Sequence, residues 1–479
     1  MRWNSSFLTI LLGRIIQGLI SFATIRLITT VLHKSEIGNQ YLFNSIILWF
    51  SLILINPFGM YVNRHIHEWQ RNHQLTAALK KMNLYFIAVA IISIPILVLV
   101  KEVFLVAENQ STLLVGILVI GYVYFGSWFQ SLSSVLNYFN KQKYFIIVNI
   151  TAQLIGLVSA YLFVSIYSAK SYFWIFGILL GQIFGLILSL YFLKKNYFFT
   201  AQDKIEISKP LKIFSKQTLS FCYPIAIATV FLWFQNQGYR LVIEKYLGSE
   251  SLAGLGVGLG IAASLAAIVE SLTTQYLYPQ YYKAIANSEK EIRSQAWEKM
   301  WRAGISIYIP SAVLVMTISS ILIQLLTSNI FHMFKNLIFY GALIELMRQL
   351  TIMLYLVSHA ENKPHVNILS YLFGAVVLGI GLIYLYQNSN FRIDSICLLL
   401  TGSYLVTLVA NMVAAYALAQ VKFYFIEMFW SFLLMLPVLA FIPVVKQLNL
   451  LTILISGLLG MYTLFVIYFR LKKQGQLIT

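Results

Sequence analysis

Long uninterrupted apolar runs constrain this chain more than any other feature. Fourteen such runs cover residues 8–32, 38–60, 84–106, 112–136, 144–167, 172–193, 218–243, 251–277, 304–327, 336–358, 367–387, 394–418, 423–445 and 450–470. Each is close to the ~20 residues that cross a bilayer as a helix. The runs are continuously apolar and do not alternate, which favours helices over a β-barrel. Only 10% of residues are charged, against about 25% in soluble proteins. We therefore predict an all-α integral membrane protein with about fourteen transmembrane helices.

The positive charge is distributed unevenly between the segments that join these runs. With a cytoplasmic N-terminus, 23 of the 34 Lys and Arg residues fall in inner segments and eight in outer ones. The remaining three, Arg14, Arg26 and Arg348, lie deep within runs. The bias follows the positive-inside rule, so we expect both termini in the cytoplasm. The net charge of +18 is thereby explained without nucleic acid. The first run lacks a small-residue cleavage site and is predicted to be a retained helix, not a signal peptide.

Two polar segments, 194–218 and 280–304, are the longest between runs. The first follows six runs and is expected to link two halves. The second has the charge alternation of an amphipathic surface helix. The turns "LHKSEIG" at 32–38 and "LGSESLAG" at 247–254 share a Leu, a Ser-Glu pair and a final Gly. Both follow odd-numbered runs, which indicates two parallel repeats related by an axis along the membrane normal.

The sequence offers little support for an enzyme. The outer connections are short and carry no group of carboxylates of the kind expected in a membrane polysaccharide polymerase or ligase. His65, His67 and His73 fall in a basic inner loop, where a solvated surface is favoured over a metal site. Cys222 and Cys397 lie within apolar runs and are interpreted as buried small residues. We expect no catalysis, no cofactor and no metal.

Charged residues inside the runs are the main functional candidates, because they are costly to insert. Each Arg near a helix centre costs roughly 2.5–3.5 kcal/mol. Arg14 and Arg26 are separated by about 18 Å along a helix, so they could act as successive stations on a polar path. Gln17, one turn from Arg14, would extend that path. The alternative is that both arginines extend to the membrane surfaces.

Three further positions stand out in the second half of the chain. Arg348 follows Glu345 by three residues, which places the two on one helix face as an ion pair. Glu270 and Glu427 have no basic residue within one turn. An unpaired carboxylate can take up a proton, so Glu270 is a candidate for ion coupling. Arg240 ends the amide-rich "FQNQGYR", which could line a polar vestibule or cap its helix.

Two stretches resemble bacterial polysaccharide flippases of the multidrug/oligosaccharidyl-lipid/polysaccharide exporter superfamily, of the O-antigen or capsule type. The first helix pair carries the resemblance at Leu32, Gly38, Tyr41, Pro57-Phe58-Gly59 and Arg64. The start of the second half carries it at Pro224 and Arg240. Many members have Asp before that Arg, whereas this chain has Tyr239, which puts a local acid–Arg pair in doubt.

This resemblance implies a fold and an activity. The fold would be two six-helix lobes, 1–205 and 206–422, around a central cavity, with two added helices in 423–479. The activity would be alternating-access transfer of undecaprenyl-diphosphate-linked oligosaccharide between leaflets. The partners would be membrane lipids, possible polysaccharide polymerase machinery and a possible coupling proton or sodium ion. The candidate substrate-binding residues are Arg14, Gln17, Arg26, Arg64, Arg240 and Arg348.

A small-molecule or drug antiporter of the same superfamily is the alternative. Such antiporters typically hold a carboxylate in the cavity of the first lobe. No acidic residue lies in the middle of a run before residue 244, which favours an anionic cargo.

Overall fold

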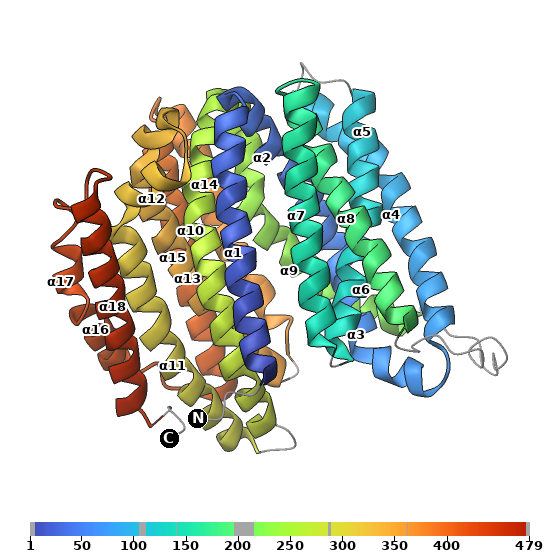
Figure 1. Ribbon diagram of the computed structural model, residues 1–479. Coiled ribbons are helices and arrows are strands. Elements are labelled where there is room, and N and C mark those ends of the chain that lie inside the picture. Colours follow the sequence, from blue (N-terminus) through green and yellow to red (C-terminus); the bar gives the residue numbers. More distant parts are fainter. Residues whose placement is uncertain are drawn as a thin grey trace. The chain divides into compact units, whose positions relative to one another are not determined.

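A computed structural model describes residues 5–104, 112–139, 141–195, 215–285, 289–361 and 363–475. Every regular element in these ranges is a helix (Figure 1). Twelve helical stretches in the described ranges are long and apolar enough to cross a membrane. One of them, Lys216–Ile285, contains two of the expected spans, separated at Gly248 (φ 78°). The prediction of an all-α membrane protein with about fourteen transmembrane helices is confirmed.

The chain divides into two compact units. The N-terminal unit comprises Asn4–Ile20 and Val31–Ala253, and the C-terminal unit comprises Met1–Trp3, Ser21–Thr30 and Gly254–Thr479. The linker expected at 194–218 lies largely outside the described residues. The division into lobes at residue 205 stays a prediction.

Helices of the N-terminal unit are often interrupted by a π-helical turn. Its elements are α1 (Ser5–Val31, shared with the other unit), α2 (Lys34–Phe50), η1 (Ser51–Ile55), α3 (Asn56–Arg71), α4 (Leu75–Phe104), α5 (Thr112–Gly121), η2 (Tyr122–Gly126), α6 (Ser127–Tyr138), α7 (Gln142–Ile166), α8 (Ser171–Lys195), α9 (Lys216–Trp233), η4 (Phe234–Gly238) and the first part of α10 (Tyr239–Ile285).

Close packing of α7 against α8 depends on small residues (Figure 1). A Cβ on Gly177 would lie 2.2 Å from the backbone nitrogen of Ala160, and one on Gly181 would lie 2.3 Å from the carbonyl oxygen of Ala152. Neither position can hold a larger residue without separating the helices. Small residues allow this approach in membranes, where packing replaces the hydrophobic driving force between helices.

Three turns that the sequence analysis placed on the outer side meet at one end of the N-terminal unit. The carboxylate of Glu36 accepts hydrogen bonds from Lys170 Nζ (3.2 Å) and from the backbone nitrogen of Ser171 (2.8 Å). A Cβ on Gly38 would lie 2.0 Å from the carbonyl oxygen of Ser249. These contacts place residues 33–38, 168–171 and 247–254 on the same side, as the predicted topology requires.

The C-terminal unit contains no π-helical turn in its described helices. Besides the remainder of α10 and part of α1, it contains α11 (Lys290–Thr317), α12 (Ser319–Leu326), the 3-10 helix η5 (Asn329–Phe334), α13 (Lys335–Ala360), α14 (Val366–Gln387), α15 (Ile393–Ala419), α16 (Phe425–Leu433), α17 (Leu436–Leu439) and α18 (Leu450–Lys473).

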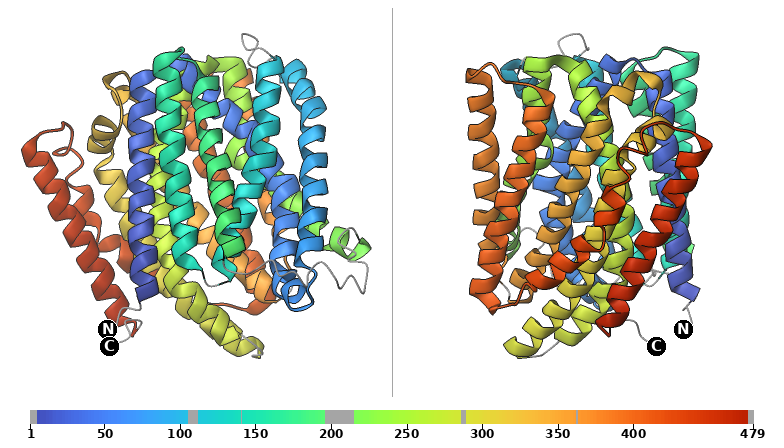
Figure 2. Two further views of the ribbon diagram at one scale, coloured as in Figure 1. Left: turned by 45° about the vertical axis from the view of Figure 1, so that its right-hand side comes forward. Right: turned by 90° about the vertical axis from the view of Figure 1, so that its left-hand side faces the viewer.

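The segment expected to form a separate amphipathic surface helix is instead continuous with a span. Residues from Lys290 onward form the first turns of α11, and Figure 2 shows the end of α10 and the start of α11 projecting beyond the other helices of this unit. Trp297 and Trp301 on this part of α11 are buried and stacked, with ring centroids 5.1 Å apart. The charged residues that suggested a surface helix therefore share this part of α11 with two buried tryptophans.

The thirteenth expected span, 423–445, is broken into α16 and α17. Pro437 explains the break, because proline has no N–H to donate and its ring clashes with the carbonyl four residues earlier. That carbonyl belongs to Leu433, the last residue of α16. Hydropathy alone could not distinguish this broken segment from a continuous helix.

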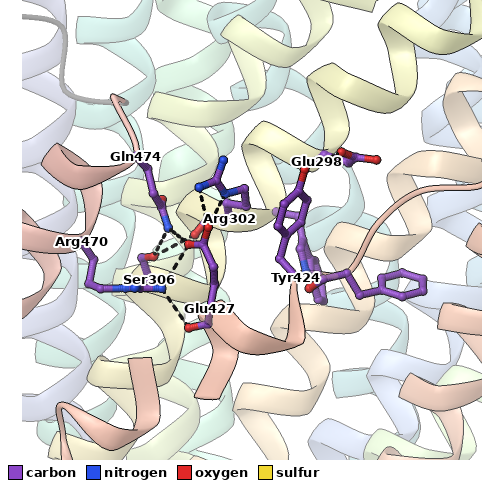
Figure 3. Close-up of polar contacts among 9 residues, drawn as sticks. Glu298, Arg302, Ser306, Tyr424, Glu427, Arg470 and Gln474 are labelled. Atoms are coloured by element: carbon purple, nitrogen blue, oxygen red, sulfur yellow. Dashed lines mark hydrogen bonds and ion pairs between the residues drawn. The ribbon is translucent and has the colours of Figure 1, made fainter. Parts of the chain in front are cut away.

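A polar cluster holds α16 and α18 against α11. Figure 3 shows Arg302, Arg470 and Gln474 converging on Glu427. Arg302 Nε donates to Glu427 Oε1 at 2.7 Å, and Arg470 Nη2 donates to Oε2 at 3.1 Å and to the Glu427 carbonyl at 2.9 Å. Gln474 also donates to the carboxylate. Glu427, which has no basic neighbour in the sequence, therefore has two arginine partners from other helices.

Candidate functional site: a polar cavity in the N-terminal unit

A cavity of about 610 Å³ lies within the N-terminal unit. Its wall is formed by α2, η1, α3, α4, η2, α6, α7, α8 and the start of α10. Lining residues on the segment α2–η1–α3 run from Tyr41 to Trp69, which is about 40 Å along the helix path. The cavity is therefore long, and its volume is in the range of 300–1,000 Å³ that is usual for ligand pockets.

The lining combines apolar surface with many polar side chains and is almost free of charge. Its amides and hydroxyls are Asn44, Asn56, Asn63, Asn149, Gln130, Gln182, Ser51, Ser131, Ser133, Ser134, Tyr41 and Tyr122. Among the lining residues in the described part of the chain, Arg240 is the one charged side chain. A wall of this kind can donate and accept many hydrogen bonds while offering a single fixed positive charge.

The π-helical segments η1, η2 and η4 of the described part of the N-terminal unit contain or closely precede lining residues of this cavity. Ser51 belongs to η1, Tyr122 and Gly126 belong to η2, and Arg240 follows η4 by two residues. A π-turn inserts one extra residue into a helix and redirects the side chains that follow it, and such turns are frequent at functional sites. The π-turns η1 and η2 therefore contribute lining residues directly, and η4 precedes Arg240.

Arg240 is held by aromatic rings. Its guanidinium carbon lies 5.3 Å from the ring centroid of Tyr41 and 5.9 Å from that of Tyr239. Within the described part of the chain no carboxylate forms an ion pair with it, and its Nε is buried without a hydrogen-bond partner. Of the two sequence interpretations of "FQNQGYR", the structure supports the polar vestibule. The aromatic contacts orient the cation and leave donors available to a ligand.

The other predicted site residues of the N-terminal unit do not line the cavity. Arg14 Nη1 donates to Gln17 Oε1 at 3.0 Å, and its guanidinium lies 5.9 Å from the Phe145 ring. Gln17 is 9% exposed. Arg64 is exposed and lies 5.9 Å from the Phe221 ring. The polar stripe expected on α1 is therefore present as an Arg14–Gln17 pair.

Arg26 lies in the part of α1 that belongs to the C-terminal unit, and its partner lies in the same unit. Its guanidinium donates to the carbonyl oxygen of Thr327, directly after the last residue of α12. The neighbouring Ser328 hydroxyl donates to the carbonyl of Thr29 at 2.6 Å. A cation at the C-terminal end of a helix is stabilised by the helix dipole. This capping contact is a reason for an arginine at position 26 that does not require a substrate.

Arg348 lies between two carboxylates of the C-terminal unit. Its Nε donates to Glu345 at 2.6 Å and its Nη2 donates to Glu270 at 2.7 Å. The predicted Glu345–Arg348 pair is confirmed. Glu270, however, is not unpaired as its sequence neighbourhood indicated, because its partner is 78 residues away in the chain. If both carboxylates are ionised, the cluster carries one negative charge in excess.

The sequence analysis did not identify the amide side chains that line the cavity. Asn44, Asn63 and Gln130 come from three different helices, and none was singled out. For Asn44 and Gln130 the available signal was an amide side chain inside an otherwise apolar run, whereas Asn63 lies just beyond the run at 38–60. In the described residues no three His, Cys, Asp or Glu side chains gather as a metal site would require.

Comparison with known proteins identifies the family of this chain. A family model described as polysaccharide biosynthesis protein matches residues 69–336, more than half of the sequence. The chain belongs to this polysaccharide biosynthesis family. No curated protein matches it in sequence.

Solved structures share its fold at low sequence identity. The inward closed conformation of the lipid II flippase MurJ has a TM-score of 0.68 and 14% identity over 98% of this chain and 99% of that chain. An inward-facing multidrug resistance MATE transporter of the MOP superfamily has a TM-score of 0.60 and 13% identity over 88% and 95%. A MOP superfamily transporter from Pyrococcus furiosus has a TM-score of 0.52 and 12% identity over 92% and 95%. This member of the polysaccharide biosynthesis family is thus a multi-pass membrane protein with the fold of MOP-superfamily flippases and transporters.

Proposed function

We propose that this protein is a flippase that moves undecaprenyl-diphosphate-linked oligosaccharide repeat units from the cytoplasmic to the outer leaflet of a bacterial inner membrane. The units would serve polysaccharide or O-antigen biosynthesis, and transfer would proceed by alternating access without covalent chemistry. The observation that supports this most is Arg240, a cation without a carboxylate partner in a cavity whose other described lining residues are uncharged.

The charge of the cavity distinguishes this function from drug antiport. A cavity that takes up cationic drugs in exchange for protons needs a carboxylate, and none is found among the described lining residues. A diphosphate, by contrast, accepts charge-assisted hydrogen bonds from a guanidinium, which are about twice as strong as neutral ones. A membrane potential that is negative inside also favours outward movement of an anion, by about 2.3 kcal/mol per charge per 100 mV.

Coupling to an ion gradient is proposed for the Glu270–Arg348–Glu345 cluster. The cluster has one carboxylate more than it has arginines, so a proton or a sodium ion would neutralise it. We expect Glu270→Gln to abolish the dependence of transport on the gradient while substrate binding is retained. Unchanged ion dependence in that variant would remove Glu270 from the mechanism.

Deletion of the gene tests the proposed function. Lipid-linked oligosaccharide should accumulate and polymer export should stop, and the wild-type gene should restore export. In the same strain we expect Arg240→Ala to lower export at least tenfold and Arg240→Lys to restore part of it, because lysine keeps the charge but loses the fork of donors. Arg392→Ala, at an exposed arginine outside the cavity, is the matched control. Normal export by Arg240→Ala at wild-type membrane abundance would refute the role of Arg240.

Orientation is tested in a variant with Cys222 and Cys397 replaced by serine. Single cysteines at Lys170 and Lys209 should react with an impermeant reagent from opposite sides of the membrane. Equal labelling of both from outside would contradict the proposed topology and the direction of transport.

A further inference from the structure

We propose that the cavity of the N-terminal unit recognises the sugar as well as the diphosphate, and that it selects an uncharged, amide-bearing saccharide such as an N-acetylated hexosamine. This inference rests on the proposed function and specifies its substrate class. It is based on the hydrogen-bonding capacity of the lining, its charge and its aromatic surfaces.

Several lining amides have no partner of their own. The side chains of Asn44, Asn63 and Gln130 form no hydrogen bond with another described residue, whereas the Asn149 amide donates to the carbonyl of Phe145 at 2.8 Å. Gln182 Oε1 is buried without a partner. Asn44 and Asn63 are half-buried and Gln130 is exposed, so these three amides are open to a ligand. The buried Gln182 oxygen lacks a donor, and a ligand that supplies one would remove that cost.

The amides are suited to particular sugar substituents. Each carboxamide presents two N–H donors and one carbonyl acceptor, which match the carbonyl and N–H of an acetamido group and the hydroxyls of a pyranose. Tyr122, Phe129 and Trp69 add flat apolar surfaces to the same wall, against which the C–H faces of sugar rings can pack. The lining therefore provides both surfaces that a neutral sugar needs.

The same lining disfavours charged sugars. A uronic acid would need a cation, but Arg240 is the one cation among the described lining residues and is assigned to the diphosphate. A sugar with a free amine would need a carboxylate, and the described lining contains none. A charge buried without a counter-charge is strongly unfavourable, so either sugar should bind more weakly than its neutral analogue.

The test compares four synthetic lipids with the purified full-length protein in lipid nanodiscs. All carry the same polyprenyl diphosphate, which is attached to N-acetylglucosamine, to glucosamine, to glucuronic acid or to no sugar. We expect the N-acetylglucosamine lipid to bind at least tenfold more tightly than the other three. Equal affinity for all four would overturn the sugar inference and leave the proposed function intact. Binding of none of them, with no transfer in proteoliposomes, would overturn the proposed function itself.

Variants locate the preference in the cavity. Asn44→Leu and Asn63→Leu keep the branching at Cγ and the number of side-chain heavy atoms but remove the amide, so each should weaken binding of the N-acetylglucosamine lipid about 5-fold without affecting the sugar-free diphosphate. Asn137→Leu, at an exposed position of α6 outside the cavity, is the matched control. Equal losses for the two lipids would overturn the inference. Asn44→Ser and Asn63→Ser provide the same comparison if the leucine variants do not fold.

Discussion

The cluster of Arg348 with Glu270 and Glu345 should respond unequally to loss of its members. Arg348→Met removes the cation and leaves two carboxylates facing one another inside the C-terminal unit. Glu270→Gln leaves one Arg–Glu pair, and the new amide oxygen can still accept from Arg348. We therefore expect Arg348→Met to destabilise the protein much more than Glu270→Gln, although each change removes one charge.

The size of the difference follows from the contacts. The side chains of Arg348, Glu270 and Glu345 are 25%, 22% and 14% exposed, so the cluster is largely but not fully desolvated. Removing one partner of a buried pair costs about 3–5 kcal/mol, and partial exposure favours the lower end of that range. Loss of one charge-assisted hydrogen bond costs about 1.5–3 kcal/mol, which the retained amide acceptor reduces to about 1 kcal/mol for Glu270→Gln.

Thermal unfolding of purified variants in one detergent measures this difference. At roughly 1 °C per kcal/mol for a chain of 479 residues, Tm should fall by about 3 °C for Arg348→Met and by about 1 °C for Glu270→Gln. The triple variant Glu270→Gln, Glu345→Gln, Arg348→Met should recover most of the loss, because a neutral replacement of a buried ion cluster is often tolerated. Arg392→Met, at an exposed site, should change little. If Arg348→Met costs no more than Glu270→Gln, or if the triple variant is the least stable, the argument from unbalanced charge is refuted.

Three other predictions concern packing, the arginines of α1 and the C-terminal helices. Gly177→Ala should reduce the folded yield severely, because the added Cβ would clash with the backbone of α7. Gly402→Ala should be tolerated, because no atom lies within 4 Å of the added Cβ. Similar yields of the two variants in detergent would contradict the packing argument. Arg14→Lys should impair export if the guanidinium grips a diphosphate, and Arg26→Lys should be tolerated if position 26 only caps α12; export and membrane abundance measured together check both. Glu427→Ala should loosen α16 and α18 by leaving two arginines without a carboxylate, seen as faster proteolysis near the C-terminus; unchanged cleavage would argue against this attachment.

The helical membrane fold could be predicted because a bilayer leaves few alternatives. Each apolar run must satisfy its own backbone hydrogen bonds, so run length nearly determines helix number. The broken segment at 423–445 was predictable in principle from Pro437, which acts on the backbone and leaves hydropathy unchanged. The π-turns η1 and η2 were not predictable, because one extra residue in an apolar run disturbs no pattern. The turn η4 coincides with the amide-rich "FQNQG", whose composition does not indicate a π-turn.

The candidate site was predictable only in part, because its properties depend on partners distant in sequence. Arg240 stood out as a cation at the end of an amide-rich segment, but the sequence could not show whether a carboxylate faced it. Glu270 has no basic residue nearby in the sequence, and its partner Arg348 is 78 residues away in the chain. Asn44 on α2 and Gln130 on α6 can be recognised as candidate ligand-binding residues only once the structure shows that both line the same cavity.

Arg240 differs from the paired charges of the C-terminal unit, and this contrast supports a ligand at Arg240. In the C-terminal unit, Glu270, Glu345 and Glu427 each accept from an arginine, so the cost of placing charge in a membrane protein is offset within the fold. Among the described residues, Arg240 in the N-terminal unit contacts aromatic rings but forms no ion pair with a carboxylate, and its Nε lacks a hydrogen-bond partner. A cation without a counter-charge is costly in a membrane protein. An anionic group that enters the cavity would supply the counter-charge for Arg240. In the C-terminal unit, carboxylates and arginines of the protein itself supply each other's counter-charges.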